Sequence, residues 1–450
     1  MKPHPVSVAA RKAEVCDLTG SWDTARELYE LNLDRAETAG SIKWAAESHY
    51  GLGKVMRYKG LFSDSLAKLK NAESLYLQIG DRRGAVMAAG AMGGVHAEQG
   101  DYAAAIRCFE QKKEWAEQNG DLMELAESWG SLGVVYNEKR LLSEALDCYL
   151  KQLSIAQQIS DLQGLSIVNG NIGNVYLFQD NLVVAAEYYA KQKDLAMLIG
   201  DKRSLCVVSC NLGLLYKYQG QQEKAVDQFE RGLKSAREIG FTRAIASIVG
   251  NLGTIYQSMG QWSKARENLM QQLNISQAIN DLQGLVTANA NLNMLEWLTG
   301  NCTKAREHIK SALDLSECHG FEDKLTICLN IAAGHEFKNR MTVEAEKHAS
   351  RALDLARKRN DAEEISRASI IISGVRVLSG NEDGLNELNG FIAGDLSDPL
   401  KNEALAMLYM CTGNKEYLAK VKLLSESLYE KTKDIAFMIS YSNLGAIPLP

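Results

Sequence analysis

Proline is nearly missing from this sequence, and its absence indicates the fold class. The five prolines of the 450 residues are Pro3, Pro5, Pro399, Pro448 and Pro450. Residues 6–398 therefore contain none of the residue that breaks helices most strongly. No stretch resembles a strand either, so we expect an all-α fold.

The chain also lacks a strong charge and an export signal. Its formal net charge is −6 and its pI about 5.8, so it has no general cationic field that would attract nucleic acid or anionic lipid. The N-terminus has no apolar signal-peptide core. The most apolar later stretch, Ala368 to Leu378, is too short to cross a bilayer and contains Arg376. We expect neither a nucleic acid nor a membrane as partner.

Disulfide spacing is missing as well. The nine cysteines are an odd number, are scattered and form no C-x-x-C pair. This usage is typical of a reducing compartment, so we expect a cytoplasmic protein.

What the chain does have is a repeat. A glycine, or a residue standing in for one, falls every twenty positions from Gly20 to Gly380. A glycine just past a helix end adopts the left-handed conformation that satisfies the last carbonyls. The spacing therefore predicts helices of roughly 18 residues, about 27 Å long. The block of forty residues predicts two helices per repeat, A and B. The marked positions are Gly20, Gly40, Gly60, Gly80, Gly100, Gly120, Arg140, Ser160, Asp180, Gly200, Gly220, Gly240, Gly260, Asn280, Gly300, Gly320, Arg340, Asn360 and Gly380.

Fixed columns of small and bulky residues run through these blocks. Small residues kept at one helical position mark close approach of two helix backbones. Helix B carries such a column at Ala25, Ser65, Ala105, Ala145, Ala185, Ala225, Ala265, Ala305 and Ala345, and a bulky residue follows four positions after each of the first eight. Helix A carries Gly53, Gly93, Gly133, Gly173, Gly213 and Gly253. Six aspartates open a helix and are N-cap candidates: Asp81, Asp121, Asp161, Asp201, Asp281 and Asp361.

These columns, as in NLGLLYKYQGQQEKAVDQFERGLKSAREIGF (Asn211 to Phe241), resemble tetratricopeptide repeats of a forty-residue type. They are similar to the arrays of Pins-type G-protein-signalling modulators and of bacterial repeat proteins. The resemblance covers about residues 6–380, some nine to ten repeats. It implies an α-solenoid, a right-handed superhelix of antiparallel hairpins. We assign residues 1–380 to the repeats and residues 381–450 to an irregular helical C-terminal cap.

The resemblance also implies that A helices line the concave face, which draws attention to their polar residues. A ladder of amides can hold the backbone of an extended peptide whatever its sequence. It can instead bond to the adjacent repeat and fix the stacking, and both interpretations stay open. The candidate peptide-binding residues are Ser131, Asn171, Asn174, Asn211, Lys217, Asn251, Asn291, Arg203 and Arg243. Replacing Asn211 and Asn251 with alanine should weaken a groove ligand and leave thermal stability nearly unchanged.

Catalytic and metal constellations are not found in the sequence. The seven histidines show no H-E-x-x-H or other metal spacing. Cys206 and Cys210 lie four residues apart on one helix face, which small apolar helical positions explain better than a redox pair. The cluster of Gly90, Gly93 and Gly94 lies inside an expected helix, without the strand that a phosphate loop requires. We therefore expect no catalytic residue, no metal and no cofactor.

The function that these patterns favour is a non-catalytic scaffold or adaptor that binds a peptide segment of a protein partner. A second hypothesis is a ligand- or peptide-sensing regulatory array of a signalling protein such as a kinase, cyclase, protease or transcription regulator. A third is an enzyme within residues 380–450, a segment that carries no catalytic constellation of its own.

Overall fold

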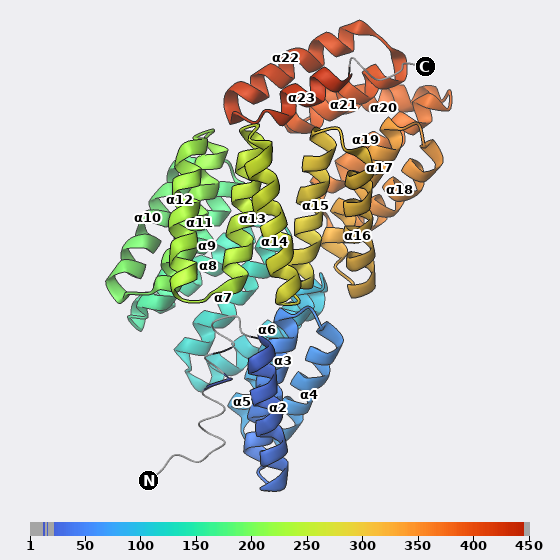
Figure 1. Cartoon of the computed structure of the whole chain (residues 1–450). Coiled ribbons are helices and arrows are strands. Elements are labelled where there is room, and N and C mark those ends of the chain that lie inside the picture. Colours follow the sequence, from blue (N-terminus) through green and yellow to red (C-terminus); the bar gives the residue numbers. More distant parts are fainter. Residues whose placement is uncertain (1–11, 14–15, 17–21, 445–450) are drawn as a thin grey trace. The chain divides into compact units, whose positions relative to one another are not determined.

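The computed structural model describes residues 12–13, 16 and 22–444, and this part of the chain is helical without a strand (Figure 1). Gly20 lies outside the described residues. Among the helices that are described, none combines the length and the apolar character needed to cross a membrane.

The helices alternate as the forty-residue period predicts. The B helices are α2 (Trp22–Thr38), α4 (Phe62–Gln78), α6 (Tyr102–Asn119), α8 (Leu142–Gln158), α10 (Leu182–Ile199), α12 (Gln222–Glu238), α14 (Trp262–Ala278), α16 (Cys302–His319) and α18 (Thr342–Arg359). The A helices are α3 (Ile42–Tyr58), α5 (Arg82–Glu98), α7 (Leu122–Glu138), α9 (Leu162–Phe178), α11 (Lys202–Tyr218), α13 (Thr242–Ser258), α15 (Leu282–Leu298), α17 (Glu322–Lys338) and α19 (Ala362–Leu378). Four helices follow the last hairpin: α20 (Glu382–Ala393), α21 (Asp398–Thr412), α22 (Lys415–Thr432) and α23 (Ala436–Leu444).

Helix ends explain the twenty-residue spacing. The marked glycines have positive φ, from 60° at Gly40 to 82° at Gly300. The residues that stand in for glycine are left-handed too, with φ of 59° at Arg140 and 55° at Ser160. One residue further on, an amide donates back across the turn, as Leu141 N does to Tyr136 O at 2.9 Å. The expectation of left-handed ends is confirmed also where no glycine is present.

The aspartate N-caps are confirmed at five of the six positions. Asp81 accepts from the amide of Gly84 at 2.9 Å, and Asp201 accepts from that of Ser204 at 3.1 Å. Asp121, Asp281 and Asp361 cap in the same way. Asp161 also stands at the N-cap position, of α9, but its side chain makes no capping hydrogen bond, and nothing in the structure explains the difference.

The small columns lie where helices approach closely. Each member of the B-helix column, from Ala25 to Ala345, has no exposed surface. A Cβ at Gly133 would lie 2.5 Å from the ring of Tyr149, and one at Gly173 would lie equally near Tyr189. In these repeats the bulky residue of the B helix therefore occupies the space that the glycine of the A helix leaves free.

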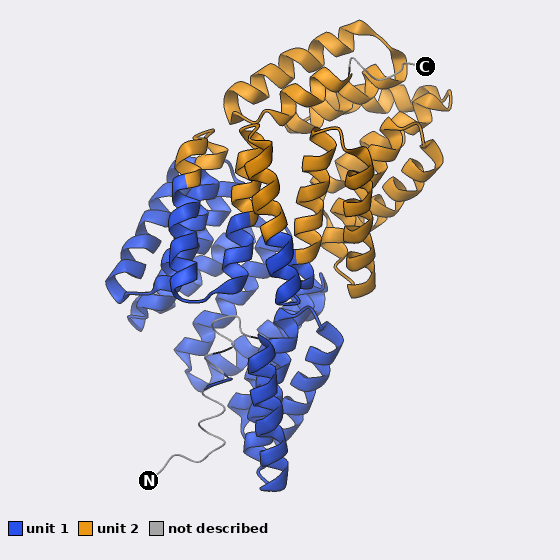
Figure 2. Ribbon diagram, in the orientation of Figure 1, with its two compact units in different colours: residues 1–215, 227–249, 272–284 blue, residues 216–226, 250–271, 285–450 orange. Residues whose placement is uncertain are grey.

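The chain divides into two compact units (Figure 2). Unit 1 comprises residues 1–215, 227–249 and 272–284, and unit 2 comprises residues 216–226, 250–271 and 285–450. In unit 2 the turn between α22 and α23 contacts the ends of two hairpins. Gln222 Nε2 donates to Lys433 O at 2.6 Å, and the amide of Ile435 donates to Ser258 O at 3.0 Å.

Candidate functional site

Five of the candidate residues form a polar column, with one residue at the same position of each of five successive A helices. Unit 1 carries Ser131 on α7, Asn171 on α9 and Asn211 on α11. Unit 2 carries Asn251 on α13 and Asn291 on α15. Asn211 is buried, with 9% of its surface exposed, and the other four side chains are half-buried.

The amides of this column differ in their bonding. Asn211 Nδ2 donates to Gln192 Oε1 at 3.4 Å, and Gln192 in turn packs against Gly170. Within the described part of the chain, the side chains of Asn171 and Asn251 have no hydrogen-bond partner. Asn211 thus contributes to packing between repeats, whereas Asn171 and Asn251 keep their donors and acceptors available.

Exposed apolar side chains accompany the column in unit 1. Ile167 is 46% exposed and lies one helical turn before Asn171, on the same face of α9. Val207, 41% exposed, has the same relation to Asn211 on α11. A polar group that can hold a peptide backbone is therefore next to an aliphatic surface that can cover a side chain.

Two further candidate residues have intramolecular contacts. Asn174 Oδ1 accepts from the hydroxyl of Tyr189 at 2.7 Å, which ties α9 to α10. In unit 2, Lys217 Nζ donates to Thr254 Oγ1 at 3.4 Å. Burial lowers the pKa of Lys217, and the carboxylate of Asp434 partly offsets this effect. Lys217 therefore lies in a crowded environment beside the turn after α22.

The two candidate arginines stack on aromatic rings of unit 1. The guanidinium of Arg203 is exposed and lies 4.7 Å from the ring centre of Phe241. That of Arg243 lies 5.6 Å from the ring centre of Trp22, and its Nε is 3.6 Å from Asp281 Oδ2. Arg203 keeps an accessible cation, while Arg243 connects the first hairpin to residues more than two hundred positions later.

Unit 2 contains an aromatic and charged cluster that the sequence interpretation missed. His335 stacks on Trp297 with ring centres 3.8 Å apart, and Lys338 Nζ lies 5.3 Å from the Trp297 ring centre. Burial lowers the pKa of His335 to about 3, so its imidazole is neutral at physiological pH. Trp297 and His335 occupy different positions of the repeat, so no column of the sequence pairs them. The sequence indicated only that both residues lie on A helices.

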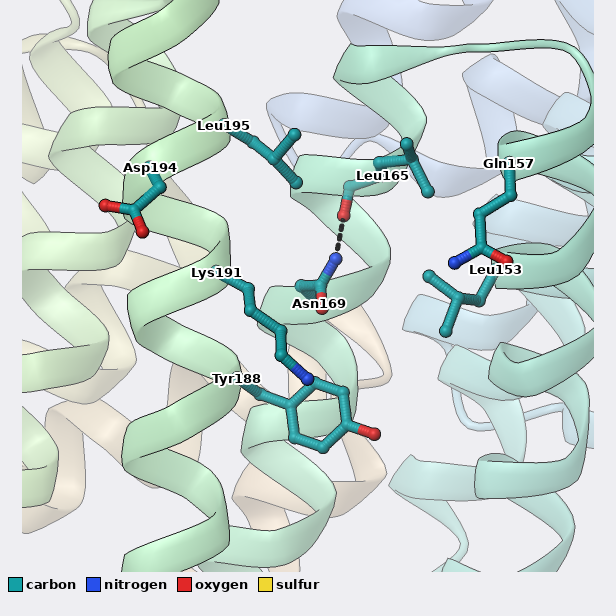
Figure 3. Close-up of a pocket in the computed structure, with 8 residues that line it drawn as sticks. All are labelled: Leu153, Gln157, Leu165, Asn169, Tyr188, Lys191, Asp194 and Leu195. Carbon is teal, nitrogen blue, oxygen red and sulfur yellow. Dashed lines mark hydrogen bonds between the residues drawn. The ribbon is translucent and has the colours of Figure 1, made fainter.

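A hollow in unit 1 was missed too. Its volume is about 400 Å³, and its lining side chains come from α8, α9 and α10 (Figure 3). They are Leu153, Gln157, Leu165, Asn169, Tyr188, Lys191, Asp194 and Leu195. Asn169 Nδ2 donates to Leu165 O at 2.6 Å, so its amide is bonded to its own helix. The signal in the sequence was a change in one column, from Trp129 to Asn169.

Among the described residues, no group of three or more histidine, cysteine, aspartate or glutamate side chains is arranged to hold a metal ion. The chemistry that the described site offers is that of amide hydrogen bonds, aliphatic surface and cationic groups.

Comparison with known proteins identifies a known repeat in the middle of the chain. The tetratricopeptide repeat model matches residues 164–238 and 244–317. No curated protein is significantly similar in sequence.

Three solved structures share the fold. The Rap conjugation gene regulator of plasmid pLS20, in complex with the Phr* peptide, is 14% identical with a TM-score of 0.52, over 63% of this chain and 77% of its own. A Rap protein complexed with Competence and Sporulation Factor is 18% identical with a TM-score of 0.51, over 80% of this chain and 99% of its own. NprR in complex with its cognate peptide NprX is 16% identical with a TM-score of 0.52, over 69% of this chain and 87% of its own. These findings show tetratricopeptide repeats within residues 164–317 and, together with the alternating helices, an all-α solenoid fold of the tetratricopeptide type.

Proposed function

We propose that this chain is a non-catalytic scaffold that binds a peptide segment of a protein partner along its A helices, in the cytoplasm. The observation that carries the proposal is the pairing of Asn171 with Ile167 on α9. The amide has no hydrogen-bond partner among the described residues, and the aliphatic side chain beside it is 46% exposed. An amide that holds a backbone and a surface that covers alternate side chains are the elements of extended-peptide recognition.

The fold neighbours support a more specific candidate. Rap of plasmid pLS20 and NprR are each described with a bound peptide, and the Rap of plasmid pLS20 is described as a gene regulator. A peptide-sensing regulatory array is therefore the second function that we propose. It shares the binding surface with the scaffold and differs in that the bound peptide changes the activity of a signalling protein.

Selection from a displayed library of random twelve-residue peptides, with the intact chain as bait, tests both candidates. We expect recovered peptides to share a pattern, and a photoreactive version of one to crosslink to α9 or α11. Recovery of no pattern, or crosslinks confined to B helices, would overturn the proposal. A peptide of this pattern that is secreted by a cell would favour sensing, and a pattern internal to a larger protein would favour a scaffold.

A further inference from the structure

The hollow between α8 and α10 has the size and lining of a small binding pocket. Its volume of about 400 Å³ falls within the range of roughly 300 to 1,000 Å³ usual for ligand sites. Three leucines and a tyrosine supply its apolar wall, and Gln157, Lys191 and Asp194 supply polar groups (Figure 3).

The preceding repeat shows what fits this place. Forty residues before Leu153, Asn169 and Lys191 stand Lys113, Trp129 and Lys151. The indole of Trp129 is half-buried, and both lysines lie over it, with Lys113 Nζ 4.7 Å and Lys151 Nζ 4.0 Å from its ring centre. The chain therefore holds a tryptophan side chain at the position that is hollow one repeat later.

A later repeat shows how such a place can be filled from the neighbouring B helix. Asn289 is the counterpart of Asn169, and its Oδ1 is 2.9 Å from Nδ1 of His308 on α16. The counterpart of His308 is Tyr188, which instead stacks on Tyr176 with ring centres 5.7 Å apart. Tyr188 is thereby held at the wall of the hollow and does not fill it.

We propose that this hollow binds an aromatic side chain of tryptophan size that a peptide partner presents, an inference that rests on the proposed peptide-binding function for the nature of the partner. Leu153, Leu165 and Leu195 would enclose the indole. Lys191, whose Nζ is now 4.4 Å from the Tyr188 ring centre, occupies the place from which Lys151 covers Trp129. Gln157 offers an oxygen to the indole N–H, which requires an acceptor when it is buried.

The test uses N-acetyl-L-tryptophanamide and the full chain, with methyl-labelled leucines observed by NMR. We expect saturable shifts of the methyl groups of Leu153, Leu165 and Leu195. N-acetyl-L-leucinamide, the matched control ligand, should bind about tenfold more weakly, because it provides neither a ring for Lys191 nor an N–H donor.

Three variants locate the site. Asn169→Trp restores the residue of the preceding repeat and should reduce the affinity by about tenfold or more, since it fills the hollow. Val183→Trp places the same side chain on α10 outside the hollow, at a position 72% exposed, and should bind within about twofold of the parent. Trp129→Asn should open a second site and raise the stoichiometry from one to two. Thermal melts check that each variant is folded.

Absence of saturable shifts at the three leucines of the parent chain would overturn the inference, and this result does not depend on any variant. Unchanged binding to folded Asn169→Trp would overturn it equally. Asn171 and Asn251 do not line the hollow, so a failed peptide selection with normal probe binding would contradict only the proposed function. Successful selection without probe binding would contradict only the aromatic pocket.

Discussion

The repeats of unit 1 and the end of unit 2 are stabilised in different ways. In unit 1 the buried apolar residues form small clusters, such as the one of Tyr102, Phe109 and Leu132, which draws on α6, α7 and α8. The end of unit 2 has one large cluster that extends from Ala333 on α17 to Leu444 on α23. The first arrangement is a stack of hairpins that contact their neighbours, whereas the second resembles the core of a globular domain.

The two arrangements predict different responses to a substitution. In a stack, stability is approximately a sum of terms for each repeat and each interface, so the destabilisation caused by a substitution stays local. In a shared core, one cavity removes contacts from several helices together. Substitutions in the two regions should therefore differ in reach as well as in magnitude.

The largest effect is expected for Leu408→Ala. Leu408 is fully buried in the cluster at the end of unit 2, so the cavity should lower the free energy of unfolding by about 2–5 kcal/mol. Amide hydrogen exchange should accelerate throughout α19 to α23. Leu423→Ala, at a side chain 68% exposed on α22, is the control and should change stability by less than about 0.5 kcal/mol.

The same measurement on Leu132→Ala tests the contrast. Leu132 is 1% exposed within the small cluster of α6 to α8, so faster exchange should be confined to those helices. Exchange that accelerates equally far from both sites would contradict the difference between the regions.

A smaller effect of either sign is expected from glycines inside A helices. A Cβ at Gly173 would lie 2.5 Å from the Tyr189 ring, so Gly173→Ala should destabilise unit 1 by about 1–3 kcal/mol. Gly334 on α17 has no atom within 4 Å of such a Cβ, so Gly334→Ala should stabilise by about 0.5–1 kcal/mol. Urea denaturation measures both, and the same sign for the two variants would refute the packing explanation.

The smallest effects are expected at the left-handed helix ends. Ser160 has a φ of 55°, so Ser160→Gly should stabilise by up to about 1 kcal/mol. The reverse change at the equivalent end of the next repeat, Gly200→Ser, should destabilise by a similar amount, since Gly200 has a φ of 68°. Equal melting temperatures for both variants and the parent would show that conformation at this position does not maintain the spacing.

Much of this fold could be predicted from the sequence because it follows from local rules that recur every forty residues. The turn at Gly80 depends on a left-handed backbone angle, and the repeated glycine column predicts it. The packing of Tyr189 against Gly173 depends on side-chain volume, and the repeated small and bulky columns predict it. The bond of Gln222 to Lys433 could not be predicted, because it joins segments 211 positions apart that share no column. Its partners depend on how α22 and α23 fold back within unit 2.

The candidate site could be predicted only in part. The column of Asn171, Asn211 and Asn251 was visible as a repeat, but the bond from Asn211 to Gln192 depends on two different columns in contact. The environment of Arg243 was hidden for the same reason, since Trp22 approaches it from a repeat more than two hundred positions earlier. The hollow could have been predicted only by noticing that Asn169 stands where the preceding repeat has Trp129.

The most direct test of the peptide-binding account measures affinity and stability for Asn171→Ala, with a peptide from the library selection as ligand. Because the amide of Asn171 has no hydrogen-bond partner among the described residues, the variant should bind about tenfold more weakly by calorimetry. Its melting temperature should stay within about 2 °C of the parent. Undiminished affinity, or a loss of stability as large as the loss of binding, would contradict the claim that this column holds a peptide.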